Sequence, residues 1–137
     1  MPERSVHDNR IVAYQVDAER RRIVLHTRDE EPVPAEQTDI VFEGVLAYYF
    51  EGDNLGSILA GVKEIALEQL VGKNRALFER EHKYAWPGPW NTSPEASLHH
   101  FQSNGAKAFE ISSYYGLAGW VVADACRFEV PPGERAV

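Results

Sequence analysis

The sequence is short of the residues that build sulfur sites and membrane spans. It contains a single cysteine, Cys126, among 137 residues, which leaves no internal disulfide and no cysteine-built zinc site. The longest unbroken apolar run, Val45–Phe50, is far shorter than the ~20 residues of a membrane-spanning helix. The first residues carry no apolar signal-peptide core. We therefore expect no membrane association and, by default, a cytoplasmic protein.

Basic residues are outnumbered by acidic ones. The chain has 14 lysines and arginines against 21 aspartates and glutamates, a formal net charge of −7. Nucleic-acid-binding proteins usually gather a basic stripe. The densest basic cluster here, Arg20–Arg22, lies beside Asp17 and Glu19 where a hairpin turn is predicted, and we interpret it as a solvated turn with local charge pairs. The composition disfavours nucleic-acid binding and fits a basic protein partner.

Catalytic motifs are also missing. The chain has no Gly-x-Ser-x-Gly nucleophile elbow. The stretch from Gly56 to Gly61 lacks the lysine of a phosphate-binding loop. We therefore predict no catalytic residue, no metal site and no cofactor, and we lean towards a protein that is not an enzyme.

Histidine beside a carboxylate gives one candidate polar site, His7 with Asp8. A neighbouring carboxylate can orient an imidazole, although the same pair can instead cap the start of a sheet. Glu79 and His82 share a helix face at i,i+3, but a carboxylate-bridged metal site needs two such pairs, so we interpret them as a charged helix end. A small metal-dependent or His/Asp hydrolase built from His7, Asp8, His82 or His99 stays as an alternative function.

Apolar alternation at period two predicts most of the strands, and a run rich in β-branched and small apolar residues predicts the one over 57–65. The segments are 11–16, 22–28, 38–50, 57–65, 107–113 and 120–130, the first two forming a hairpin with a four-residue connection. Segment 38–50 is predicted to be one long strand, with a bend or close backbone approach at Gly44. Its predicted buried face carries Ile40, Phe42, Leu46, Tyr48 and Phe50. Segment 120–130 is predicted to place Trp120, Val122, Cys126, Phe128 and Val130 on one face.

Two helices are predicted between the fourth and fifth strands. A 3.6-residue period runs from about Leu67 to Lys83, and a second helix begins after the N-cap Ser93 and ends at Asn104-Gly105. The order ββββααββ predicts an α+β fold, a largely antiparallel sheet of about six strands with two helices packed on one face. We expect a single domain over 1–137 with flexible ends at about 1–5 and 131–137.

Aromatic residues in two loops are the best candidates for a binding site. Tyr84, Trp86 and Trp90 share a proline-rich loop, and Tyr114 and Tyr115 share another. Tyrosine and tryptophan on ordered loops supply large contact areas at low entropy cost. The alternative is that Trp86 and Trp90 cover one end of the core.

Four segments carry a resemblance to known proteins: Val6-His7-Asp8, the hairpin from Tyr14 to His26, the run Asp39–Val45 and the ending Tyr114–Trp120. Together they resemble a group of small bacterial proteins of unknown function. Some similar proteins of this size are immunity proteins, which neutralise a toxin by binding it. The resemblance implies a non-catalytic protein-binding domain, in its most concrete form an immunity-type inhibitor of a toxin. A homo-oligomeric structural module is the third alternative.

Overall fold

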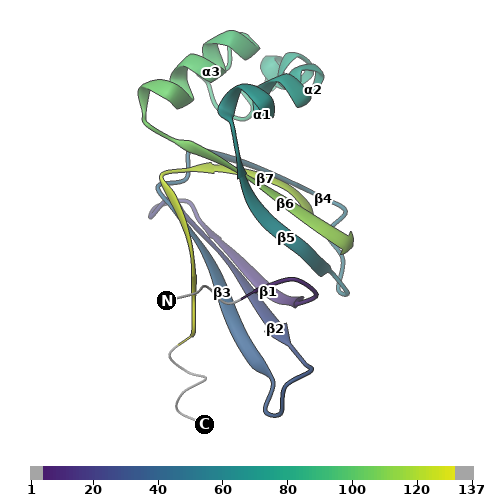
Figure 1. Ribbon diagram of the computed structural model, residues 1–137. Helices are drawn as coiled ribbons and strands as arrows, with labels where there is room; N and C mark the ends of the chain where they lie inside the picture. Colours follow the sequence, from purple (N-terminus) through teal and green to yellow (C-terminus); the bar gives the residue numbers. More distant parts are fainter. Residues whose placement is uncertain (1–4, 132–137) are drawn as a thin grey trace.

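The computed structural model describes residues 5–131, so most of both predicted flexible ends lies outside the described residues. The described residues form one eight-stranded sheet in the order β4-β7-β6-β5-β1-β2-β3-β8, antiparallel throughout, and three α-helices (Figure 1). The prediction of six strands and two helices is therefore wrong, although the fold is α+β. None of the helices in this part of the chain has the length and apolar content needed to cross a bilayer. The elements are β1 Arg10–Asp17, β2 Arg22–Asp29, β3 Glu36–Glu43, β4 Ala47–Glu51, β5 Ile58–Ile65, α1 Leu67–Lys73, α2 Arg75–Glu81, the 3-10 turn η1 His82–Tyr84, α3 Pro94–Ser103, β6 Lys107–Tyr115, β7 Ala118–Ala123 and β8 Ala125–Glu129.

Two of the predicted strands are each divided by a sharp bend, and the two bends touch. β3 continues into β4 through Gly44, whose φ of +64° is a left-handed conformation that favours glycine. β7 continues into β8 through Asp124, whose backbone N–H donates to the Glu43 carbonyl at 2.9 Å. A Cβ added at Gly44 would lie 2.1 Å from Asp124 Oδ2. The close approach of these segments replaces two long strands with four short ones.

The bend at Gly44 also redistributes the side chains of segment 38–50. Ile40 and Phe42 are fully buried within the sheet, and Phe50 packs against the same cluster. Leu46 instead packs against the helices, and Tyr48 is 38% exposed. The prediction that all five side chains share one buried face is therefore wrong, because the bend adds non-strand residues between the two extended pieces.

The bend at Asp124 has the same effect on segment 120–130. Trp120 and Val122 are buried on the helix side of the sheet. Cys126 and Phe128 pack inside the bent sheet instead. One unpaired residue between two strands shifts the alternation by one position, so the predicted common face is wrong.

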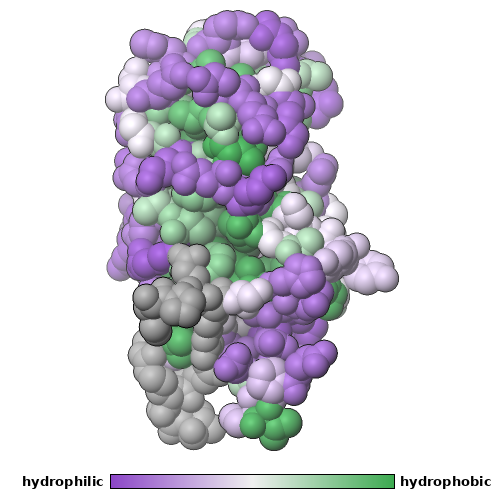
Figure 2. All heavy atoms as spheres, viewed as in Figure 1, coloured by the Kyte–Doolittle hydropathy of each residue, from purple (hydrophilic) through white to green (hydrophobic). Residues whose placement is uncertain are grey.

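The bent sheet and the helices make three layers with two apolar clusters (Figure 1). The inner cluster lies between β5, β6 and β7 on one side and β1, β2 and β3 on the other. The outer cluster lies between the helices and the other face of β4, β7, β6 and β5. Figure 2 shows mostly hydrophilic residues on the outside of the helical layer and hydrophobic residues reaching the surface below it, over the strands. The helices thus cover only half of the sheet.

The predicted helix from Leu67 to Lys83 is two short helices and a 3-10 turn. Asn74 separates α1 from α2 with φ −110° and ψ 17°. Its side-chain amide donates to the Leu70 carbonyl at 2.8 Å, a local bond by which asparagine competes with the helical backbone. The start of α3 is as predicted, because Ser93 Oγ accepts the Ala96 N–H at 3.0 Å.

Candidate functional site

One edge of β1 is left unpaired. β1 pairs with β2 along its length, but on its other side it meets β5 only at Arg10, opposite Ile58. Within the described residues no strand pairs with that edge from Val12 to Asp17. The segment Val12–Val16 contains no charge and no proline, the residues by which proteins usually protect a strand edge. The edge is therefore available for pairing.

β4, an end strand of the sheet, lies beside this edge without pairing to it. At one end the Val45 N–H donates to the Arg21 carbonyl at 2.8 Å. At the other end the Tyr14 hydroxyl donates to Asp53 Oδ2 at 2.6 Å, and the rings of Tyr14 and Phe50 lie 5.7 Å apart. We call the space between the two strands the β1–β4 groove.

Cavities lie at both ends of the groove. The larger, about 500 Å³, is bounded by the β1–β2 turn, by residues 45–50 and by Trp86 and Pro87. The smaller, about 280 Å³, lies between residues 10–14 and the loop Asp53–Leu55. The larger cavity is in the size range of ordinary ligand sites.

Exposed apolar side chains concentrate along the groove. The described chain exposes nine large apolar side chains, and five of them line the two cavities. These five are Val12, Tyr14, Val16, Tyr48 and Leu55. Such concentration marks interaction surfaces, whereas apolar residues scattered singly do not.

The charged groups at the mouth of the larger cavity are not equally neutralised. The backbone N–H and guanidinium of Arg20 bond to the Asp17 carboxylate at 3.0 and 2.9 Å and hold the pKa of that carboxyl below its usual value. The Nε–H of Arg21 donates to the Val45 carbonyl at 3.2 Å. No carboxylate of the described residues lies within ion-pair distance of Arg21. Arg21 therefore presents an unpaired cation to the groove.

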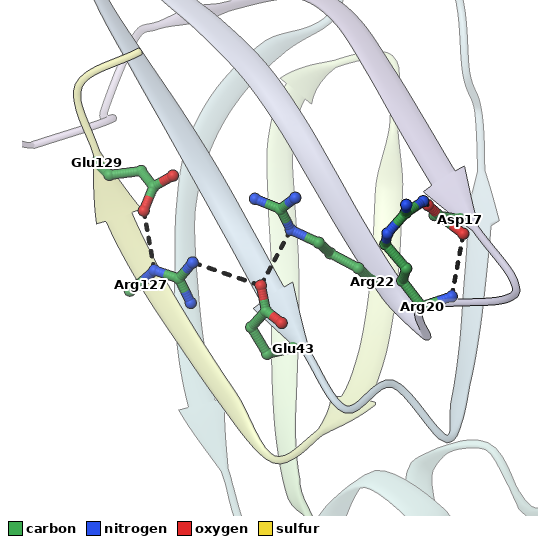
Figure 3. Close-up of polar contacts among 6 residues, drawn as sticks. All are labelled: Asp17, Arg20, Arg22, Glu43, Arg127 and Glu129. Atoms are coloured by element: carbon green, nitrogen blue, oxygen red, sulfur yellow. Dashed lines mark hydrogen bonds and ion pairs between the residues drawn. The ribbon is translucent and has the colours of Figure 1, made fainter. Parts of the chain in front are cut away.

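The opposite surface, the outer face of β2, β3 and β8, carries compensated charges (Figure 3). Glu43 lies between Arg22 and Arg127, at 3.0 and 3.4 Å, and Arg127 also bonds to Glu129 at 2.9 Å. The Nε–H of Arg22 is not directed at Glu43, so that contact is an ion pair rather than a hydrogen bond. The bond to Glu129 is the main cause of the raised pKa of Arg127. The end strand β8 therefore bears charges, which the segment Val12–Val16 of β1 lacks.

The two predicted binding tryptophans are half-buried in the outer cluster. The ring of Trp86 lies 5.8 Å from that of Tyr49 and 6.0 Å from that of Trp120. Trp90 stacks on His100 at 4.5 Å. Both therefore pack against the core, and Trp86 also borders the larger cavity.

The other predicted site residues lie at two separate places. Tyr84 is exposed after α2. Tyr114 and Tyr115 are exposed at the far end of β6, where Tyr114 Oη lies 2.6 Å from His7 Nε2. His7 Nδ1 lies 3.2 Å from Asp8 Oδ2. The structure thus brings His7 and Asp8 to Tyr114, away from the helices, so the five aromatic residues do not form one surface.

The imidazoles of the hydrolase alternative have separate partners. His82 Nδ1 lies 2.6 Å from the Asn91 carbonyl oxygen, and His99 Nε2 lies 3.3 Å from Ser103 Oγ. In residues 5–131 no three histidine, cysteine or carboxylate side chains cluster as a metal site would require. The chemistry available at these positions is hydrogen bonding.

Sequence reasoning missed the groove and one further polar pair. His26 Nδ1 lies 2.7 Å from Asp39 Oδ1, because the two residues are directly opposite in the β2–β3 ladder. The uncharged run Val12–Val16 was the only local signal for the groove. Comparison with protein-family models, curated proteins and solved structures gives no significant match to this chain.

Proposed function

We propose that the protein is a non-catalytic protein-binding domain of the cytoplasm that holds its partner in the β1–β4 groove. The observation that carries the proposal is the gathering of five of the nine exposed large apolar side chains along this groove. Binding energy in protein interfaces concentrates in aromatic and arginine side chains at the centre of a contact. Tyr14, Tyr48 and Arg21 supply those residue types here.

An immunity-type inhibitor is the most concrete form of this proposal. Support comes from the sequence resemblance to small immunity-like bacterial proteins and from the net charge of −7. An acidic domain attracts a basic partner at long range, and such steering weakens as salt rises.

The test uses a displayed library of random peptides of about twelve residues, selected on the wild-type protein. Enriched peptides are then measured against the groove variants Val16→Ser and Tyr48→Ser. The matched controls are Val33→Ser and Tyr115→Ser, which truncate exposed side chains outside the groove. We expect the groove variants to lose tenfold or more in affinity, equivalent to about 1.4 kcal/mol, and the controls to bind as wild type.

Two results would overturn the proposal. Loss of binding in Tyr115→Ser but not in Val16→Ser or Tyr48→Ser would move the site to the loop after β6. The selection could also yield no peptide that binds the wild-type protein in solution. If sedimentation then shows concentration-dependent dimerisation, the protein is instead a homo-oligomeric module.

A further inference from the structure

We propose that the groove takes an extended segment of the partner protein, which adds to β1 as a new strand and sets an acidic side chain against Arg21. This inference rests on the proposed function and specifies its binding mode and ligand chemistry. It combines three observations: the unpaired backbone of β1, the alternation that the groove's side chains impose, and the unpaired cation at one end.

The backbone of β1 supplies the first part of the argument. From Val12 to Asp17 its outer N–H and C=O groups have no strand partner among the described residues. A peptide that pairs with such an edge gains main-chain hydrogen bonds whatever its sequence. β4 lies along the other side of the groove and is also an end strand. An extended segment that pairs with β1 would therefore also lie against β4.

The side chains on the groove floor supply the second part. Val16 and Tyr14 of β1 lie opposite Ile23 and Leu25 of β2, so they share the face that turns towards the inner cluster. Successive side chains of an added strand would point alternately towards this floor and away from it. Every second residue of the bound segment must therefore be apolar, while the residues between can be polar.

Charge complementarity supplies the third part. Of the carboxylates around the turn, Asp17 is bonded to Arg20 and Glu43 forms an ion pair with Arg22. Glu19 lies within the turn itself and is not within ion-pair distance of Arg21. Arg21 is exposed, and among residues 5–131 the hydrogen bond of its side chain goes to the Val45 carbonyl. The opposite end of the groove carries the Asp53 carboxylate, which already accepts the Tyr14 hydroxyl. An acidic residue is therefore favoured at the Arg21 end of the segment and not at the other.

The probe is a synthetic peptide of about eight residues, with alternating valine and threonine, blocked termini and a glutamate at one end; a twin carries the glutamate at the other end. Amide hydrogen exchange of Val12–Asp17 is followed during titration. We expect exchange of the outward-facing amides of β1 to slow at least tenfold at saturation, because new strand pairing protects them. Methylating the peptide nitrogens on one edge should abolish binding, and methylating the other edge should not.

The charge contact is tested from both sides. Replacing the peptide glutamate with lysine should weaken binding to wild type threefold or more, and the lysine peptide should recover on Arg21→Glu. Lys63→Glu, which alters an exposed cation of β5 outside the groove, is the control and should not change the preference. Replacing the glutamate of the peptide needs no change to the protein, so this measurement does not depend on whether a protein variant folds.

The outcomes separate this inference from the proposed function. Strand addition is overturned if the peptides need Val16 and Tyr48 for binding but leave the β1 amides unprotected from exchange. It is also overturned if the peptides still bind after methylation of either edge. In both cases groove binding itself remains supported. Equal affinity for glutamate and lysine peptides overturns the role of Arg21. No groove-dependent binding of these peptides or of the displayed library overturns both proposals.

Discussion

β4, which borders the β1–β4 groove, is held against β7 through a close approach at Gly119. Replacing this glycine is the sharpest test of the architecture. Gly119 lies in β7 opposite Phe50 of β4, with φ +149°. A Cβ at this position would lie 1.8 Å from the Tyr49 carbonyl oxygen, a backbone atom that cannot turn away. Gly119→Ala must therefore push β4 away from β7.

The expected cost follows from two contributions. A non-glycine residue in this backbone region costs about 1–3 kcal/mol. Loss of about two ladder hydrogen bonds between β4 and β7 adds roughly 1 kcal/mol each. We therefore expect Gly119→Ala to lower the free energy of unfolding by about 3–5 kcal/mol, a large share of the ~5–15 kcal/mol typical of a domain.

The same substitution at Gly61 of β5 is the matched control. No atom lies within 4 Å of a Cβ added there, and its φ is not in the left-handed region. Gly61→Ala should be neutral or stabilise by up to about 1 kcal/mol, because alanine restricts the unfolded chain. Urea unfolding followed by tryptophan fluorescence gives both values, provided that the m-value is unchanged. A Gly119→Ala protein within about 1 kcal/mol of wild type would show that β4 is not held against β7 as described.

Three smaller predictions concern single side chains. The hydrogen bond to Asp53, together with burial, raises the pKa of Tyr14. In ultraviolet titration, Tyr14 should therefore ionise at a higher pH in the wild-type protein than in the Asp53→Asn variant. Because the pKa of Tyr14 is higher in the folded state, the stabilisation is complete below the unfolded pKa of about 10 and is lost as pH rises through the folded pKa. If the wild type instead became more stable relative to Asp53→Asn above the folded pKa, the reasoning would be contradicted. Asn91→Ala should lower the free energy of unfolding by about 2–4 kcal/mol, because the buried amide bonds two backbone carbonyls and a serine hydroxyl. Ser93→Ala should lower it by about 1 kcal/mol through loss of the cap on α3, while Ser93→Asp should keep stability near wild type.

The local elements were readable from the sequence. The strand patterns located the extended segments, although two of the six predicted segments are two strands each, and the hairpin of β1 and β2 has the predicted four-residue connection. The cap at Ser93 was readable because capping depends on residues a few positions apart. In each case the causes lie within one turn or one strand of the residues concerned.

The sequence alone did not show where regular structure is interrupted. The bends at Gly44 and Asp124 arise from an approach between segments that are far apart in the chain. Asn74 divides the long helix although the 3.6-residue period runs through it. A one-residue interruption moves every later side chain to the other face, so these local events decide which residues are buried.

The sequence by itself determined an acidic α+β chain, its extended segments and its helix start. Only the tertiary structure decided that β4 lies beside the unpaired part of the β1 edge and that Trp86 and Trp90 pack against the core. It also decided that, within residues 5–131, Arg20 and Arg22 have a carboxylate partner and Arg21 does not. The physical reason is range: periodicity and capping act between near neighbours, whereas strand pairing, burial and charge compensation depend on which distant segments meet.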